Sequence, residues 1–196
     1  MIAVPPPGLD DLVDHVLQRL SAATADLAAP WRTPMLATIS QAGAPTLRTV
    51  VLRAVDPRNR SLRINTDRRS DKAGQTARNP ATELCFWHPV AGQQLRIAGD
   101  AAVEASGPVA DATWSALSAE GRALYRPGPP PGTPTQGSAP LDHPPTDPDG
   151  GSRASFAVVG VTWRSWDWVW LGPNAHRRAR MRWLADGKLD AEWVVP

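Results

Sequence analysis

RTVVLRAVDPRNRSLRINTDRRSDK, residues 48–72, joins two runs of aliphatic and β-branched residues to a polar segment rich in cations and hydroxyls. The turn Asp56-Pro57-Arg58-Asn59 separates the runs, and a helix is predicted to begin after Ser70, a favourable N-cap residue. The first N–H groups of a helix lack intrahelical acceptors and attract anions. The stretch therefore predicts a site for a phosphate-bearing ligand. Its candidate polar side chains are Arg48, Arg53, Thr66, Arg69, Ser70 and Lys72.

The composition indicates a single domain, residues 1–196, with mild bulk charge. Charged residues make up 20% of the chain and the formal net charge is +2, which argues against a dedicated nucleic-acid binder. Cys85 is the one cysteine, so no internal disulfide is possible and a reducing cytoplasm fits. No stretch approaches ~18 uninterrupted apolar residues, and the N-terminus lacks a signal-peptide pattern. We expect a cytoplasmic protein without a membrane partner.

Hydrophobic periodicity predicts a mainly β protein with peripheral helices. Apolar residues recur at helical spacing across residues 9–25, which indicates an amphipathic helix. About seven or eight antiparallel strands without a βαβ rhythm favour a closed or split β-barrel. The first three strands are expected to form an antiparallel meander of residues 35–40, 46–55 and 61–65. The other expected strands are 81–88, 93–104, 156–171, 177–184 and 189–195, and the other expected helices are 71–78 and 108–125.

Two further predictions concern segments that contain glycine. Gly99 lies in the middle of the strand 93–104, which indicates a β-bulge or a close backbone approach. Residues 127–152 are dominated by proline and glycine, so they are expected to form a long loop outside the core.

Signatures of side-chain catalysis and metal binding are missing. The sequence has no P-loop, no G-x-G-x-x-G after a strand and no G-x-S-x-G. Its four histidines are scattered without an H-E-x-x-H pair, so no metal site is predicted. Cys85 lies in an apolar run and is interpreted as a small core residue rather than a nucleophile. Any chemistry is therefore expected to come from a cofactor.

Four segments resemble the pyridoxamine 5′-phosphate oxidase-like family of FMN-binding split barrels, in its divergent, oxidase-related branch. They are R-x-V-x-L-R at residues 48–53, N-T-x-x-x-S-x-K at residues 65–72 followed by Asn79-Pro80, Q-x-R-I-x-G at residues 94–99, and W-x₉-R from Trp170 to Arg180. The segments occur in the family's order. The resemblance predicts an antiparallel FMN-binding split β-barrel.

The resemblance implies an FMN site shared by two subunits. Arg48 and Lys72 resemble the family's phosphate ligands, while Trp170 and Arg180 resemble residues that the partner subunit supplies. A homodimer with FMN at its interface is thereby implied. The implied cofactor-binding residues are Arg48, Thr49, Val50, Val51, Leu52, Arg53, Asn65, Thr66, Ser70, Lys72, Gln94, Trp170 and Arg180. Among them, the backbone of residues 49–52 is implied to run past the isoalloxazine ring.

One departure from the family lies inside the phosphate segment. Asp71 stands directly before Lys72, where the family's oxidases usually carry arginine. Arg68 or Arg69 could replace the missing contact.

Further departures lie on the substrate side. His176 and Arg178 stand where the family's oxidases have an R-x-H pair that touches the substrate. The family's contacts to a substrate phosphate are replaced by Tyr125-Arg126-Pro127 and a proline-rich run. We interpret the cofactor site as retained and the vitamin B6 substrate site as altered, with His176 and Arg178 as candidate substrate residues.

The leading hypothesis is an FMN-binding flavoprotein that acts as an oxidoreductase on an unknown small substrate. The alternative is a non-catalytic FMN-binding or sensing protein. Nucleic-acid binding by the basic run 176–182 is disfavoured, because a strand divides its charges between two faces.

Overall fold

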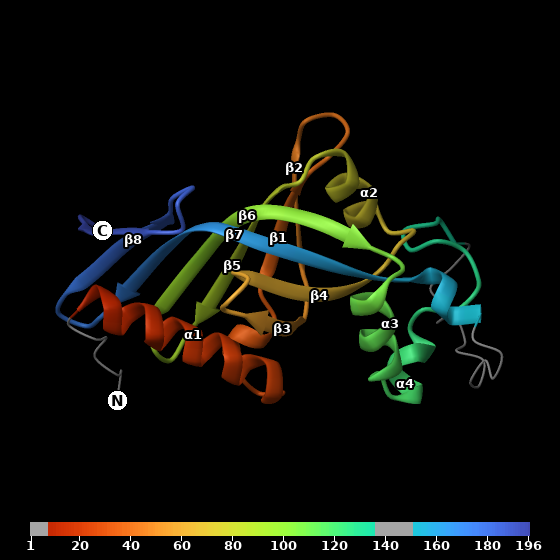
Figure 1. Ribbon diagram of the computed structural model, residues 1–196, viewed down its shortest axis with the longest axis horizontal. Coiled ribbons are helices and arrows are strands. Elements are labelled where there is room, and N and C mark those ends of the chain that lie inside the picture. The colour runs from red at the N-terminus through yellow and green to blue at the C-terminus, as the bar shows by residue number, and fades with distance from the viewer. Residues whose placement is uncertain (1–7, 136–150) are drawn as a thin grey trace.

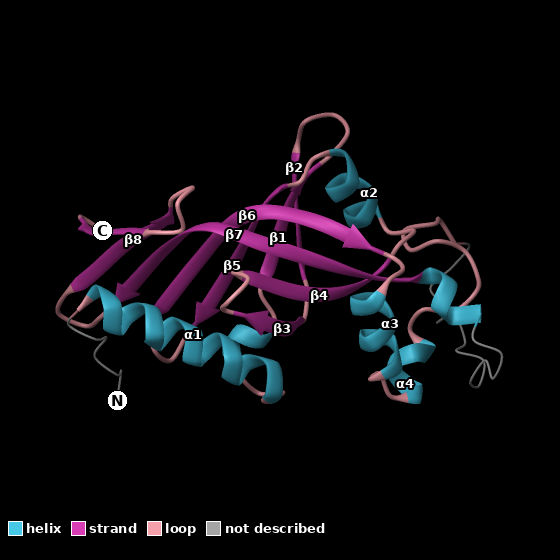
Figure 2. Cartoon of the chain, in the orientation of Figure 1, coloured by secondary structure: helices cyan, strands magenta, loops and turns pink. Residues whose placement is uncertain are grey.

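The structure is a computed structural model that describes residues 8–135 and 151–196. These residues form a nine-stranded antiparallel sheet whose main path is β2-β1-β5-β6-β7-β4-β3, with β8 paired to β7 and β9 to β8 (Figures 1 and 2). The strands are β1 Met35–Ile39, β2 Pro45–Thr49, β3 Leu52–Asp56, β4 Ser61–Asp67, β5 Ala81–His88, β6 Gln93–Glu104, β7 Phe156–Leu171, β8 His176–Trp183 and β9 Leu189–Val194. The helices are α1 Leu9–Ala25, α2 Asp71–Arg78, α3 Pro108–Ser115 and α4 Ala119–Ala123, with 3₁₀ turns η1 Pro30–Arg32 and η2 Gly151–Ser155.

The barrel is open between β2 and β3, which are joined only by Val50 and Val51. The predicted single strand 46–55 and the predicted meander are both wrong, because β2 pairs with β1 while β3 pairs with β4. A two-residue link spans at most roughly 11 Å, so the two ends of the sheet path must curl towards each other. At the crossing, the Val50 N–H leaves the ladder and donates to the Pro34 carbonyl at 2.9 Å. The expected split barrel is thus confirmed, with its split inside R-T-V-V-L-R.

β7 is the central strand of the sheet. It pairs with β6 along most of its length, with β4 through its first half and with β8 through its second half. The register between β6 and β7 shifts where Ala98 faces Ser165 and Gly99 faces Trp163, which leaves Arg164 as the extra residue. The predicted irregularity at Gly99 is confirmed. The bulge brings two tryptophans three residues apart onto one face of β7.

Gly99→Ala is expected to destabilise the fold, whereas Gly160→Ala is not. A Cβ at Gly99 would overlap the Thr162 carbonyl oxygen and come within 2.9 Å of the Trp163 Cα, and these are backbone atoms that cannot rotate away. Gly160 lies in the paired strand with no atom within 4 Å of its virtual Cβ. We expect a loss of about 1–3 kcal/mol for G99A, or a fall in Tm of roughly 2–10 °C in a thermal melt. Equal melting temperatures for the two variants would contradict the bulge.

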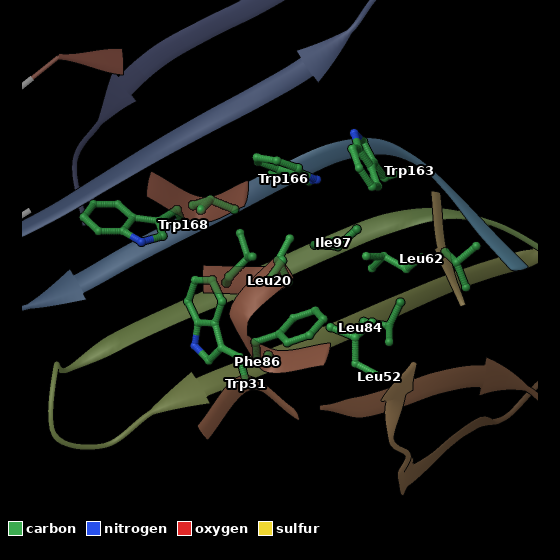
Figure 3. Close-up of a cluster of buried hydrophobic side chains, with 14 of the residues drawn as sticks. Leu20, Trp31, Leu52, Leu62, Leu84, Phe86, Ile97, Trp163, Trp166 and Trp168 are labelled. Carbon is green, nitrogen blue, oxygen red and sulfur yellow. The ribbon is translucent and has the colours of Figure 1, made fainter. Parts of the chain in front are cut away.

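The core lies between the inner face of the sheet and α1. Leu12, Val16 and Leu20 form the fully buried face of this helix, whose predicted bounds are confirmed. Figure 3 shows Trp163, Trp166 and Trp168 in a row along β7, where all are at most 2% exposed. The tryptophan cluster is therefore mainly a packed sheet face. No helix among the described residues is long and apolar enough to span a membrane.

A second, smaller apolar cluster joins α3 and α4 to the start of β7. Tyr125 packs edge-on against Phe156 at 4.9 Å between ring centroids, and Trp114 lies against both rings. The single helix predicted over 108–125 is interrupted, because Ser118 caps α4 through the Gly121 N–H. Of the predicted loop 127–152, residues 127–135 carry no regular helix or strand, residues 151–152 open η2, and residues 136–150 lie outside the described residues.

Candidate functional site

The Arg48 guanidinium is fixed at the end of the barrel beside α2. Its Nη1 donates to Thr38 Oγ1 at 2.6 Å, and its Nη2 donates to Thr46 Oγ1 at 2.8 Å and to Gln75 Oε1 at 3.0 Å. Gln75 Oε1 also accepts from Thr38 Oγ1 at 2.6 Å. These partners are neutral, so they orient the guanidinium without cancelling its charge.

Lys72 places a second cation near Arg48. Burial lowers the pKa of the Lys72 amine and the charge of Arg48 lowers it further, while Asp67 and Asp71 act in the opposite direction. Burial also lowers the pKa of Arg48. Among residues 8–135 and 151–196, neither cation has a carboxylate oxygen within 4.0 Å. Two partly desolvated cations without an ion-pair partner fit a phosphate dianion.

The N-terminus of α2 adds backbone donors to the same corner. Ser70 is the N-cap residue, as predicted, but its side chain makes no capping hydrogen bond. The Ser70 hydroxyl instead donates to the Asp67 carbonyl at 2.7 Å and lies 3.1 Å from Thr66 Oγ1. The first N–H groups of the helix therefore keep their capacity to bind an anion. Lys72 belongs to this first turn, so the helix start and the cation share one location.

The arginine that precedes α2 is engaged elsewhere. Arg69 Nη2 pairs with Asp67 Oδ2 at 2.7 Å, and the same guanidinium donates to the carbonyl oxygens of Gly128 at 2.7 Å and Arg126 at 3.1 Å. Arg69 thus fastens the residues after α4 to the turn between β4 and α2, which leaves it unsuited to replace the contact missing at Asp71. Asp71 itself is exposed and forms no ion pair with a described residue.

The crossing between β2 and β3 presents the other predicted flavin-facing residues. Thr49 is exposed, Val50 is buried and Val51 is half-buried. Arg53 is the extra residue of a β-bulge, because Leu52 faces Ile64 while Ala54 faces Arg63. Bulges re-aim side chains next to functional sites, and the Arg53 side chain is exposed.

Two further polar groups lie near this bulge, of which Tyr125 was not singled out as a ligand by the sequence. Burial raises the pKa of the Tyr125 phenol, while the charge of Arg53 lowers this pKa and the charge of Asp67 raises it. Asn65, which was predicted, has a buried Oδ1 with no hydrogen-bond partner among the described residues. A buried acceptor without a donor is unusual in proteins, so a ligand N–H or O–H would stabilise it.

The remaining predicted residues lie on the C-terminal strands. Gln94 and Arg178 flank Val169 across β6, β7 and β8, on the sheet face opposite the core. We name this surface the open face. Arg180 and His176 also belong to it, since they alternate with Arg178 along β8. Trp170 lies on the opposite face, 6% exposed, with the Arg177 guanidinium 6.0 Å from its ring centroid.

One chain does not bring all the predicted residues together. β8 lies at one end of the longest axis of the molecule, and α2 lies towards the other end (Figure 1). The elements that carry Arg180 and Lys72, β8 and α2, are therefore well separated within one chain. The expectation that the partner subunit supplies Trp170 and Arg180 stays a prediction.

Sequence reasoning missed the residues that hold the arginines in place. Thr38, Thr46 and Gln75 orient Arg48, and Asp167 pairs with Arg178. Polar residues at core-facing positions of strands were an available signal for Thr38 and Thr46, since buried hydroxyls need partners. Asp167 was the one carboxylate inside the tryptophan-rich run.

Comparisons with known proteins agree with this fold. The family model described as pyridoxamine 5′-phosphate oxidase, FMN-binding domain, matches residues 15–105. The chain is 30% identical to pyridoxine/pyridoxamine 5′-phosphate oxidase 2 of Arabidopsis thaliana over 146 residues, which cover 71% of this chain and 73% of that protein. It is 32% identical to the pyridoxine/pyridoxamine 5′-phosphate oxidase of Anaeromyxobacter dehalogenans over 96 residues, or 49% of this chain and 48% of that protein.

Two crystal structures share the whole fold. A pyridoxamine 5′-phosphate oxidase-related, FMN-binding protein from Nostoc punctiforme is 25% identical, with a TM-score of 0.74 and coverage of 99% of this chain and 100% of that chain. PhzG from Burkholderia lata, in complex with tetrahydrophenazine-1-carboxylic acid, has a TM-score of 0.70, 19% identity and coverage of 100% and 99%, and at that identity it shows the fold alone.

The open barrel and these relatives thus define an FMN-binding split-barrel protein. The chain belongs to the pyridoxamine 5′-phosphate oxidase FMN-binding family. The expected cofactor, FMN, is confirmed at the level of this family.

Proposed function

We propose that the chain is an FMN-dependent oxidoreductase that works as a homodimer on a small organic substrate. The observation that carries the proposal is the pair of cations Arg48 and Lys72, which have no ion-pair partner among the described residues and lie beside the start of α2. When bound, FMN supplies two-electron transfer between the substrate and an acceptor such as oxygen or a nicotinamide. Relatives named as oxidases support this reaction class.

The chain's own residues would bind and orient the cofactor. Arg48, Lys72 and the N–H groups of α2 would hold the phosphate by charge-assisted hydrogen bonds. The half-buried Val51 at the split offers an apolar surface to a ring system, and the bulge at Arg53 places a cation beside it. Asn65 Oδ1 offers an acceptor to a ligand donor.

A homodimer is proposed because the site is incomplete in one chain. Hydrophobic side chains on the open face remain accessible, namely Leu47 at 61%, Trp87 at 43% and Met35 at 40%. A continuous face of this kind marks an interaction surface. Pairing two such faces by a two-fold axis would allow Arg180 of one subunit to approach the cationic corner of the other.

The test begins with the purified protein. We expect a yellow protein with a flavin absorption spectrum, release of a cofactor with the mass of FMN, and bleaching of the bound flavin by a nicotinamide or by a substrate. A colourless protein that takes up no FMN on titration would overturn the proposal. A flavin that stays oxidised with every nicotinamide and B6 vitamer tried would favour the alternative, a non-catalytic FMN-binding protein.

A further inference from the structure

Asp167 holds together three arginines of the open face. Its Oδ1 accepts from Arg178 Nε at 2.9 Å and its Oδ2 from Arg178 Nη2 at 2.7 Å. The same Oδ2 accepts from Arg96 Nη2 at 2.7 Å and lies 3.9 Å from Arg180 Nε. The register explains the cluster, because Asp167 is directly opposite Arg96 on β6 and Arg180 on β8.

The pair between Asp167 and Arg178 is strong for a sheet surface. It is bidentate, which adds geometric constraint to charge, and the exposed fractions of the two side chains are 15% and 26%. Burial alone would raise the pKa of Asp167, but the hydrogen bonds from Arg178 and Arg96 outweigh burial and lower it. The carboxylate is therefore charged at neutral pH, and it keeps the Nε and Nη2 groups of Arg178 hydrogen-bonded.

The neighbouring cations on β8 differ from Arg178 in this respect. Arg180 has an exposed fraction of 56% and, among the described residues, its one ion pair is the long contact to Asp167; His176 is exposed. Within the basic run 176–182, Arg178 is the residue whose guanidinium donates to a carboxylate through both Nε and Nη2. A substrate anion that used Arg178 would have to displace a carboxylate that is already in place.

We propose that Asp167 is a specificity-determining residue, which withdraws Arg178 from anion binding and so selects a substrate that has no phosphate or other strongly anionic group at that end. This inference rests on the proposed function and on the sequence-based expectation that His176 and Arg178 are substrate residues. The Asp167 carboxylate takes the place that a substrate anion would have as the partner of Arg178. A phosphate-bearing ligand gains little there, and a ligand of the same shape without the phosphate loses nothing.

Asp167→Asn tests this inference with matched probes. Asparagine keeps the size and the acceptor oxygen of Asp167 but removes its charge. Arg178 therefore loses its ion pair while β7 keeps its structure. Dissociation constants are measured by calorimetry for pyridoxal 5′-phosphate and for pyridoxal. We expect the wild type to bind the two within about threefold of each other, and D167N to bind the phosphate form on the order of tenfold more tightly with pyridoxal unchanged.

Two further variants separate this role from bulk charge and from folding. Glu192→Gln removes a carboxylate opposite Arg180 on β9, so it changes the net charge equally but leaves the Asp167–Arg178 pair intact. We expect it to resemble the wild type. The double variant D167N/R178Q is expected to lose the gain in affinity for the phosphate form, whereas a purely structural effect of D167N would persist in it.

The outcomes are distinguishable from failure of the proposed function. Every titration is run with and without saturating FMN, and FMN uptake is measured for each variant. A wild-type protein that takes up no FMN would overturn the proposed flavin function. An unchanged ratio of the two probe affinities in D167N, an equal gain in E192Q, or a wild type that already prefers the phosphate form by more than about tenfold would overturn the role of Asp167.

Discussion

Arg48→Ala and Lys72→Ala are each expected to weaken FMN binding by roughly 30- to 4,000-fold, which corresponds to about 2–5 kcal/mol for removing one partner of a desolvated charge pair. Among the described residues, neither side chain has a carboxylate oxygen within 4.0 Å that could take over the phosphate's role. Fluorescence titration with FMN, in which binding changes the flavin emission, measures the loss. Riboflavin, which lacks the phosphate, is expected to bind both variants as it binds the wild type.

Arg58→Ala is the matched control for these variants. Arg58 is an exposed cation in the turn between β3 and β4, and its removal changes the net charge by the same amount. We expect its FMN affinity to stay within about twofold of the wild type, because exposed charges are largely screened. A thermal melt separates binding from folding, since Arg48 also holds Thr38, Thr46 and Gln75 in place. Unchanged FMN affinity in folded R48A and K72A would refute the phosphate assignment.

Leu47→Arg is expected to convert the proposed dimer into a monomer and to reduce FMN uptake with it. Leu47 is 61% exposed on β2, in the apolar part of the open face. A two-fold axis places the substituted residue in both copies at the interface, so two new charges must be desolvated together, at a cost of several kcal/mol. Light scattering coupled to size-exclusion chromatography measures the mass, and the flavin absorbance of each peak measures loading.

Leu27→Arg provides the control, because Leu27 is 81% exposed after α1 and outside the open face. It should leave both the mass and the flavin loading unchanged. If L47R retained the dimer, or if a monomeric L47R bound FMN as tightly as the wild type, the interface assigned to the open face would be incorrect.

Local sequence signals were sufficient for most elements. The bounds of α1 and α2 follow from apolar spacing at 3.6 residues and from the N-cap Ser70, and the structure confirms both. β5, β6 and β7 likewise match their predicted ranges. These elements depend on periodicity and turn chemistry within a few residues, which single-sequence reasoning can evaluate.

The break at Val50–Val51 could not be found in the same way. Two β-branched residues favour strand continuation, and only the closure of the curled sheet explains why the chain leaves β1 and joins β4. The error spread to the predicted meander, because one uninterrupted strand would have placed residues 52–56 beside β1.

By itself, the sequence determined which residues carry cations and hydroxyls between Arg48 and Lys72, and where the helix after Ser70 begins. The tertiary structure alone decided which of those cations are available. Arg48 and Lys72 converge without an ion pair to any residue that the structure describes. Arg69 turns away to the residues after α4, and the distant Arg178 pairs with Asp167. The reason is physical: a side chain's charge is set by its type, but its partners are set by strand register and by chain crossings that bring distant residues together.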